Sequence, residues 1–358
     1  MTTPDPASSK DPTLRVGLVQ FKPTKADVAA NLARVRDRIA AAKDLDLLVF
    51  PETVLSGYFL EGGVQEIALE ASELALRLGA PPEDGPDVIL GFYERWRGRL
   101  YNAAAYLSPE DGHYRVVHVH RKIFLPTYGV FDEERYVESG TEVRAFDTRF
   151  GRRGMLVCED AWHSMTRTAL AVGGAELIAI VSATPARGVT PSEGRPNNLD
   201  RWQRIAQVMA VEHGVFVVIS HLVGSEGGKL FAGDSLAVSP DGDVMARAPL
   251  FEEGVTRVSC DSGQIVRARA SSPLLSDLEK VLPHLGREMD AALDLGRGRN
   301  PGRGHKAAGW RPPAFKGRGA GATAAGGAGR PDPEDNSVLD IDTALVERAL
   351  IEFLRDEI

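Results

Sequence analysis

Short apolar, β-branched runs alternate with longer amphipathic segments from residue 14 to residue 260, and this alternation constrains the fold more than any other feature of the chain. It is typical of a layered α/β protein, in which strands build sheets and helices cover their faces. Between residues 88 and 120 the pattern changes, because three strands follow one another with only short turns. So many strands predict two sheets with helix layers outside them. The expected strands span residues 14–21, 45–50, 87–93, 100–107, 114–120, 153–158, 176–181, 215–220, 235–239, 243–248 and 255–260.

Four helices are expected, at residues 25–43, 64–78, 164–172 and 200–213. The last has an apolar face at helical spacing, made of Trp202, Ile205, Ala206 and Met209. Asp200 is predicted to cap this helix, because an aspartate side chain accepts hydrogen bonds from the free N–H groups of a first turn.

The composition is that of an ordinary globular protein with a sizeable core, at 43% apolar and 26% charged residues. A formal net charge of −8 argues against a general nucleic-acid binder, because phosphate neutralisation needs a basic contact surface. Residues 1–13 are expected to be a disordered tail without a signal-peptide pattern, and no later stretch is apolar enough to span a bilayer. We therefore expect a cytoplasmic protein that does not bind a membrane.

The sequence changes character after residue 294, so the folded domain is expected over residues 14–294. Residues 295–337 are rich in Gly, Ala, Pro and Arg and predict a disordered linker, and residues 338–358 predict an amphipathic helix. The linker is basic, which leaves a tether for nucleic acid or an acidic partner as an alternative to a solvated spacer. The apolar stripe of the terminal helix needs a surface on this chain, on a dimer mate or on another protein.

Glu52, Lys122 and Cys158 stand at the carboxyl ends of predicted strands, where α/β sheets place reacting groups. Cys158 ends a buried strand and begins an acidic turn, so its thiol stands at a strand-to-helix bend, where the N–H of Glu159 can point at a developing oxyanion. Two cysteines are too few for a disulfide framework or a zinc cage. Taken alone, Cys158 and Cys260 are both interpreted as small core residues.

The neighbourhoods of the other two residues support a shared site. Glu52 ends the apolar strand in DLLVFPET, and Lys122 ends YRVVHVHRK, where a period of two places His118, His120 and Lys122 on one face. An inward-facing lysine needs a carboxylate partner, because burying an unpaired charge is costly. The three groups suit acyl transfer: the carboxylate takes the thiol proton, and the ammonium favours the thiolate and then the tetrahedral intermediate. This chemistry requires no metal and no organic cofactor.

The motifs FPET, RKIFLP and VCEDAW occur in the order in which the nitrilase, or carbon-nitrogen hydrolase, superfamily carries its Glu, Lys and Cys, and the chain resembles that superfamily over residues 14–260. The resemblance implies a four-layer αββα sandwich and a homo-oligomer that assembles through helices beside the active site. The segment YGVFDEERYVESG resembles the family's run after the lysine, which makes Glu133 a second glutamate that holds the lysine or the attacked carbonyl. The residues that match the family's amide pocket are Tyr128, Phe131, Glu159 and, less closely, Tyr58.

Within the superfamily, the segments LPTYGVFDEERY, CEDAW and LFAGDSLAVSPDGDVMARAPLFEEG are most similar to the glutamine-hydrolysing domain of glutamine-dependent NAD synthetases. No Ser-Gly-Gly pyrophosphatase loop follows the linker, so we do not expect NAD synthesis by this route. A second carboxylate near the pocket favours a substrate that bears an ammonium group.

The sequence therefore predicts an amidase that releases ammonia from a small glutamine-like or other ω-amide, through a thioester on Cys158, with that amide and water as its partners. Loss of Cys158, Glu52 or Lys122 is expected to abolish turnover with unchanged thermal stability. The alternatives are an ammonia-supplying glutaminase subunit, a nitrilase, a Cys–His hydrolase using His120 or His163, a metal site at the HVH histidines, and a non-catalytic interaction protein of the same fold.

Overall fold

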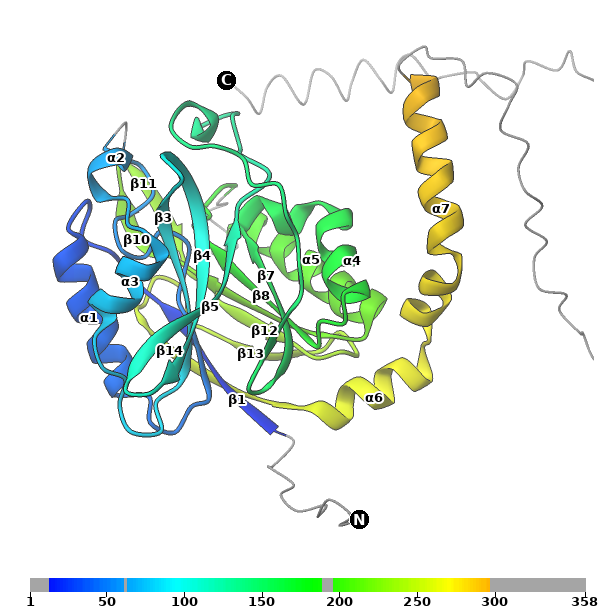
Figure 1. The fold of residues 1–358 in the computed structure, drawn as a ribbon, viewed down its shortest axis with the longest axis horizontal. Helices are drawn as coiled ribbons and strands as arrows, with labels where there is room; N and C mark the ends of the chain where they lie inside the picture. Colours follow the sequence, from blue (N-terminus) through cyan, green and yellow to red (C-terminus); the bar gives the residue numbers. More distant parts are fainter. Residues whose placement is uncertain (1–12, 61–62, 189–195, 297–358) are drawn as a thin grey trace, which may run out of the picture. The chain divides into compact units, whose positions relative to one another are not determined.

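The computed structural model describes residues 13–60, 63–188 and 196–296 (Figure 1). The predicted linker at 295–337 and the predicted helix at 338–358 lie outside these residues, except that the last described helix ends at residue 296. The tail expected at 1–13 also lies outside them, except that Thr13 begins the first strand. No helix in the described ranges has both the length and the apolar character needed to cross a bilayer.

The first sheet has six strands in the order β14-β1-β2-β3-β4-β5. β1, β2 and β3 are parallel neighbours, whereas β3, β4 and β5 form an antiparallel meander, as the sequence predicts for residues 88–120. The strands are β1 (Thr13–Gln20), β2 (Leu47–Val49), β3 (Asp87–Trp96), β4 (Arg99–Glu110), β5 (His113–Arg121) and β14 (Gly254–Asp261).

The second sheet also has six strands, in the order β13-β12-β9-β8-β7-β6. Its centre is the parallel set β7, β8 and β9. The strands are β6 (Phe146–Thr148), β7 (Gly151–Val157), β8 (Leu177–Ser182), β9 (Phe216–His221), β12 (Leu236–Val238) and β13 (Val244–Arg247). A two-stranded hairpin, β10 (Val223–Glu226) and β11 (Lys229–Ala232), belongs to neither sheet.

Helices cover the outer faces of both sheets, as Figure 1 shows. On the first sheet these are α1 (Val28–Ala40) and α3 (Ala71–Leu78), and on the second they are α4 (Ser164–Val172) and α5 (Asn197–His213). The remaining helical elements are α2 (Val64–Ile67), α6 (Ser262–Ser271), α7 (Leu274–Gly296) and the 3₁₀ helices η1 (Glu133–Arg135) and η2 (Cys158–Trp162). The predicted four-layer αββα sandwich is confirmed.

The side-chain alternation of the strands explains the layers. In β2, Leu47 and Val49 join the core between the two sheets, whereas Leu48 and the following Phe50 pack with the helices on the outer face. Successive strand residues point to opposite faces, so a strand that is apolar at every position has a buried partner on each side. The centre of the molecule is therefore apolar, and polar groups placed there need hydrogen-bond partners.

Three helix predictions are wrong in detail. The helix expected at 64–78 is two helices, because Leu69 leaves the helical conformation to pair with the edge of β3, its N–H donating to Tyr93 O at 3.1 Å. The helix expected at 25–43 begins only at Val28, after Asp27 caps it by accepting from the N–H of Ala30. Asp200 does not cap α5, since that helix begins at Asn197 and Asp200 lies in its first turn.

The sequence also missed several elements. The strands β6, β10 and β11 are short, and the helices α6 and α7 follow the last predicted strand. α7 contacts α4 and α5, so the described chain continues the outer layer of the second sheet beyond residue 260.

Candidate active site

Glu52 lies on a tight turn after β2, where the chain passes very close to β3. A Cβ atom at Gly91 would lie 2.5 Å from the Cα of Glu52, so only glycine permits this approach. The Glu52 carboxylate is fully buried, and its Oε2 accepts the N–H of Ala183 at 2.6 Å, just beyond the end of β8. Its Oε1 accepts from Nδ2 of Asn102 at 2.7 Å. Glu52 thus connects the two sheets at the carboxyl ends of their parallel strands.

Lys122 follows β5 and is fully buried between two carboxylates. Its Nζ lies 2.9 Å from Oε1 of Glu52 and 2.7 Å from Oε1 of Glu133. Burial alone disfavours the ammonium, but the attraction of Glu133 and Glu52 outweighs it and raises the Lys122 pKa well above its usual value. The lysine therefore remains charged, and the predicted carboxylate partner is present twice.

Glu133 is held by more than the lysine. Its Oε1 also accepts a hydrogen bond from the hydroxyl of Tyr58, and its Oε2 has no hydrogen-bond partner among the described residues. Burial raises the Glu133 pKa to about 7, against the opposing effect of Lys122. Tyr58 was expected in the amide pocket, and the structure places its hydroxyl on Glu133.

Cys158 stands where β7 passes into η2, at the bend that the sequence predicts. Its φ of 46° lies in the left-handed region that side chains with a Cβ rarely adopt, so the turn is strained at the thiol. The residue is 9% exposed, and its Sγ lies 3.5 Å from Oγ of Ser182. Such a strained turn at the end of a strand is a common setting for a nucleophile.

The charges around the thiol act in opposite directions. Burial and the nearby Glu52 carboxylate raise the Cys158 pKa to about 12, whereas Lys122 lowers it. Lys122 therefore favours the thiolate, as the sequence predicts, but burial and Glu52 outweigh its effect. At neutral pH the cysteine keeps its proton.

Sequence reasoning missed the polar residues that surround this group. Ser182 Oγ and Thr184 Oγ1 lie 2.7 Å apart at the end of β8, and the indole N–H of Trp202 donates to Thr184 at 3.0 Å. These residues form a hydrogen-bonded row that ends at the sulfur, and Ser182 and Trp202 are fully buried. Hydroxyl residues after an apolar strand are common, so the sequence held no specific signal for Ser182, Thr184 or the more distant Asn102.

Asp160, two residues after the cysteine, is also fully buried. Its Oδ2 lies 2.8 Å from Nε2 of His120, and its Oδ1 accepts the N–H groups of Ile123 and Phe124, each at 3.0 Å. The segment after Lys122 is therefore bonded to the turn that carries Cys158. The motif VCEDAW contains this aspartate, but nothing in the motif identifies its partners.

The predicted pocket residues Tyr128, Phe131 and Glu159 lie together. The hydroxyl of Tyr128 donates to Oε2 of Glu159 at 2.8 Å, and the rings of Tyr128 and Phe131 meet edge to face. Phe131 also contacts the ring of Tyr58. Tyr128 is 54% exposed, so this cluster joins the buried carboxylates to the surface.

The histidines proposed as alternatives have other contacts. His120 bonds Asp160, while His118 stacks on Phe146 and His163 stacks on Phe124. Burial lowers the His118 pKa to about 4, which keeps that ring neutral. In the pairing with β4, His118 lies opposite Tyr106 and His120 lies opposite Ala104, and both of these partners belong to the core between the sheets. The two histidines therefore share one face of β5, as expected, although their side chains meet different partners. Over the described ranges, no three side chains of His, Cys, Asp or Glu gather as a metal site.

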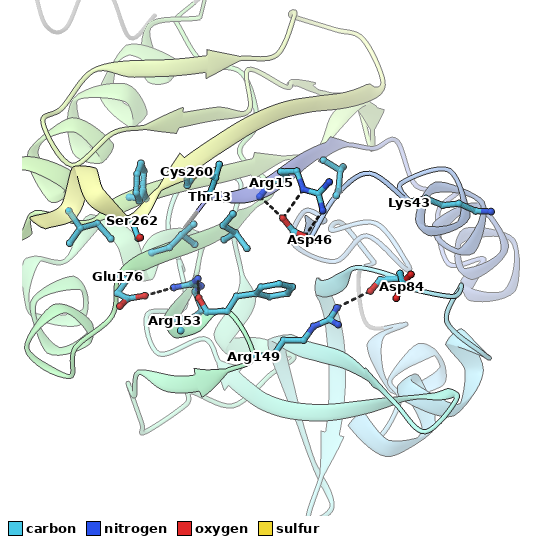
Figure 2. Close-up of a pocket in the computed structure, with 18 residues that line it drawn as sticks. Thr13, Arg15, Lys43, Asp46, Asp84, Arg149, Arg153, Glu176, Cys260 and Ser262 are labelled. Atoms are coloured by element: carbon cyan, nitrogen blue, oxygen red, sulfur yellow. Dashed lines mark hydrogen bonds and ion pairs between the residues drawn. The ribbon is translucent and has the colours of Figure 1, made fainter. Parts of the chain in front are cut away.

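A cavity of about 970 Å³ lies at the other side of the sheets, at the amino ends of the parallel strands (Figure 2). Its lining includes Arg15, Arg149, Arg153 and the second cysteine, Cys260, but none of the predicted catalytic residues. The three arginines form ion pairs with Asp46, Asp87 and Glu176. Burial raises the Cys260 pKa to about 12, so this thiol is neutral as well. Each of these arginines thus has a carboxylate partner, and the predicted catalytic residues lie at the opposite ends of the strands.

The chain is similar to several known proteins. The sequence model of the carbon-nitrogen hydrolase family matches residues 15–270. The chain is 32% identical over 267 residues to a glutamine-dependent NAD(+) synthetase of Thermotoga maritima, covering 73% of this chain and 44% of that protein. It thus spans less than half the length of that relative.

Two further proteins are similar over nearly their whole length. An (R)-stereoselective amidase of a Pseudomonas species is 31% identical over 282 residues, which cover 75% of this chain and 93% of the amidase. A crystal structure of a carbon-nitrogen hydrolase from Helicobacter pylori G27 superposes with a TM-score of 0.62 at 21% identity, covering 75% of this chain and 95% of that one. The second similarity concerns the fold alone.

Proposed function

This chain belongs to the carbon-nitrogen hydrolase family, and on that basis we propose that it hydrolyses a small amide through a thioester on Cys158. The observation that carries the proposal is the buried ammonium of Lys122 between the Glu52 and Glu133 carboxylates, beside a strained cysteine. Burying three charges at one point is expensive, and a merely structural role explains neither the arrangement nor its place next to a thiol.

In the first step, Cys158 attacks the amide carbonyl as Glu52 removes the thiol proton. A neutral resting thiol needs such a base, because its pKa of about 12 leaves almost no thiolate at neutral pH. Each carboxylate oxygen can accept two hydrogen bonds, and among the described residues Oε2 of Glu52 accepts one, from the N–H of Ala183. The second position suits the thiol proton.

Lys122 stabilises the oxyanion of the tetrahedral intermediate. An ammonium has three protons, and two of them bond Glu52 and Glu133, which leaves the third for the substrate oxygen. The two carboxylates fix the ammonium before the substrate arrives, so little reorganisation is needed during the reaction.

Collapse of the intermediate breaks the carbon–nitrogen bond, and Glu52 gives its proton to the departing nitrogen. Ammonia leaves and a thioester remains on Cys158. Water then attacks the thioester while Glu52 takes one of its protons, and the proton returns to the sulfur as the carboxylic acid is released. Every group returns to its starting state, and the reaction consumes one amide and one water.

We further propose that Glu159 and Tyr128 receive an ammonium group on the substrate, which makes a glutamine-like ω-amide the preferred class. Their side chains are in contact, and because Tyr128 is exposed and Glu159 is partly exposed, a cation can reach this carboxylate. The similarity to glutamine-dependent synthetases supports a second candidate, a glutaminase that supplies ammonia to a synthetase. The Pseudomonas relative supports an amidase that acts alone.

Ammonia release from a panel of primary amides, including glutamine, tests the proposal, with nitriles as a separate arm. We expect release from an ω-amide by the natural chain and none by Cys158→Ala, with a covalent acyl adduct on Cys158 in the intact mass. Cys260→Ala is the matched control, because that thiol is also buried but lies at the other end of the strands. Full turnover by Cys158→Ala, or by a chain that forms no adduct, would falsify the proposal.

We also propose a homo-oligomer that assembles through the helices of the second sheet. Met165 on α4 and Val208 and Val211 on α5 are exposed apolar residues on neighbouring helices. Light scattering of the purified chain measures the assembly, and a monomer at all concentrations contradicts it.

A further inference from the structure

The β10–β11 hairpin lies outside both sheets, yet it is bonded to the loops that hold the two active-site carboxylates. On one side, Glu226 at the end of β10 reaches the loop after Glu52. Its Oε2 accepts the N–H of Tyr58 at 3.0 Å, and its Oε1 accepts the N–H of Phe59 at 2.6 Å. One carboxylate therefore satisfies two consecutive backbone N–H groups.

The loop is shaped to receive this carboxylate. Gly57 has a φ of 80°, and a Cβ atom there would lie 2.7 Å from Oε2 of Glu226. Any other residue would therefore push the carboxylate away as well as strain the backbone. The backbone of Tyr58 is held from a second side, where its carbonyl accepts the hydroxyl of Tyr93 at 3.1 Å.

Tyr58 connects the loop that Glu226 binds to the buried carboxylate of Glu133. Its hydroxyl bonds Oε1 of Glu133, the same oxygen that receives the Lys122 ammonium. A tyrosine ring is rigid, so the position of its hydroxyl follows the position of its backbone. The path from Glu226 to the lysine therefore has only two intermediate residues, Tyr58 and Glu133.

The other strand of the hairpin, β11, is bonded to the loop that follows β8 of the second sheet. Leu230 O accepts the N–H of Ala186 at 2.7 Å, and Phe231 pairs with Pro185. Pro185 and Ala186 come shortly after Ala183, whose N–H donates to Glu52. Phe231 also packs in one apolar cluster with Tyr58 and Ala183. The hairpin thus contacts both loops whose groups bond the active-site carboxylates.

We propose that Glu226 is a positioning residue of the active site, which holds the Tyr58 hydroxyl on Glu133 and through it the Lys122 ammonium beside Cys158. An effect of Glu226 on turnover rests on the proposed function, whereas its positioning of Tyr58 does not depend on the reaction. Glu226 touches neither the substrate nor the reacting atoms, and it acts through the backbone of residues 58 and 59.

The readout is the pH dependence of the Cys158 thiol. The groups that face Glu133 are Lys122 after β5, Glu52 after β2, Tyr93 on β3, and Tyr58 and Cys158. Among them, the Tyr58 hydrogen bond lowers the Glu133 pKa, so its loss moves that pKa upward. If ionised Glu133 is needed to fix Lys122, the acid limb of the reactivity profile then moves to higher pH.

The experiment measures alkylation of Cys158 by iodoacetamide from pH 5.5 to 9, resolved from Cys260 by mass spectrometry, and ammonia release over the same range. For Glu226→Gln we expect the acid limb to rise by about half a unit, which slows alkylation about threefold on the acid side. Tyr58→Phe, which removes the intermediate hydroxyl, is expected to move the limb in the same direction. The double variant is expected to move it no further than the larger single change, because both substitutions interrupt one path.

Glu253→Gln is the matched control. Glu253 also accepts a backbone N–H, that of Lys22 at 2.8 Å, and pairs with Arg34 at 2.6 Å, but it joins β14 to α1 and not to the active site. Its profile is expected to superimpose on that of the natural chain. An unshifted limb in Glu226→Gln, an equal shift in Glu253→Gln, or fully additive shifts in the double variant would overturn the proposal.

The two readouts keep this inference apart from the proposed function. If the natural chain releases no ammonia from any amide but the alkylation limb shifts as expected, the positioning role stands and the amidase proposal fails. If ammonia is released and neither profile shifts, the amidase proposal stands and the role of Glu226 is wrong.

Discussion

The carboxylate of Asp160 lies 2.8 Å from Nε2 of His120, and this fully buried contact joins the turn of Cys158 to the segment that carries Lys122. Asp160 also bonds the N–H groups of the two residues that follow the lysine, Ile123 and Phe124. Cys158 follows a strand of the second sheet and Lys122 follows a strand of the first, so their relative position depends on such links between the sheets as much as on either sheet.

We expect Asp160→Ala to lose about 3 kcal/mol of unfolding free energy, since it leaves several buried donors without an acceptor. Turnover falls with it, because the lysine segment is no longer bonded to the cysteine turn. Asp160→Asn keeps one oxygen for the two N–H groups and is expected to lose less. Urea unfolding measures the difference, and Asp147→Asn, at an exposed ion pair, serves as the control. A loss no greater than that of the control contradicts this account.

Lys122→Ala and Cys158→Ala should differ in stability, although both are expected to abolish turnover. Removing the lysine leaves Glu52 and Glu133 buried without their cation, which costs about 3–5 kcal/mol. Removing the sulfur leaves no unpaired charge. The expectation from sequence, that all three substitutions leave thermal stability unchanged, is therefore revised for Lys122. Calorimetry compares the melting temperatures of both variants, with Lys43→Ala as a lysine control. Equal melting temperatures of Lys122→Ala and Cys158→Ala would show that the ammonium is not needed to offset the buried carboxylates.

The pH profile of turnover should have an acid limb and no alkaline limb from the thiol. Glu133 has a pKa of about 7, so below that pH it binds a proton and its attraction for Lys122 weakens. Cys158 has a pKa of about 12, so the thiol keeps its proton throughout the neutral range. We expect kcat/KM to fall as the pH drops through about 7, and Glu133→Gln to remove that limb along with most of the activity. If the acid limb persists unchanged in Glu133→Gln, the limb reports the titration of another group.

The same shift gives a stability prediction with a definite sign. A carboxyl whose pKa is raised on folding binds more protons in the native state, so its contribution to stability is present below about pH 4.5 and is lost as the pH rises towards about 7. Glu133→Gln removes this term. We expect the unfolding free energy of that variant, relative to the natural chain, to rise between these pH values. A constant difference across the range would mean that Glu133 has the same pKa in both states.

Ser182→Ala should slow the reaction of the Cys158 thiol. The Ser182 hydroxyl donates to Sγ at 3.5 Å and lowers the Cys158 pKa against the larger effects of burial and Glu52. Its loss removes a donor that stabilises the developing thiolate. Ser220→Ala on the adjacent β9 is the matched control, because that buried hydroxyl bonds Val19 O instead. The rate of Cys158 alkylation at pH 8 is measured in both variants. Equal rates would show that the Ser182 hydroxyl does not affect the reactivity of the thiol.

Much of this architecture was predictable because it is local. The short apolar, β-branched runs predicted every strand of the two sheets except β6, and the meander at β3, β4 and β5 followed from short turns alone. Strand ends also predicted where Glu52, Lys122 and Cys158 lie, since parallel strands end at a common edge. The wrong helix at 64–78 shows the limit of local reasoning: its apolar period is continuous, but Leu69 is drawn to the edge of β3 by a contact that no local pattern encodes.

The sequence by itself determined the layers, the family and the chemical groups of the site, because periodicity and strand-end position are properties of neighbouring residues. Only the tertiary structure decided what those groups do to one another. Asn102, Asp160 and Glu226 meet their partners from distant positions, and Tyr58 bonds Glu133 across 75 residues. The pKa of Cys158 depends on charges and burial contributed by several separate segments. Desolvation and Coulomb interactions act through space, so the protonation of this site is fixed only once the chain has folded.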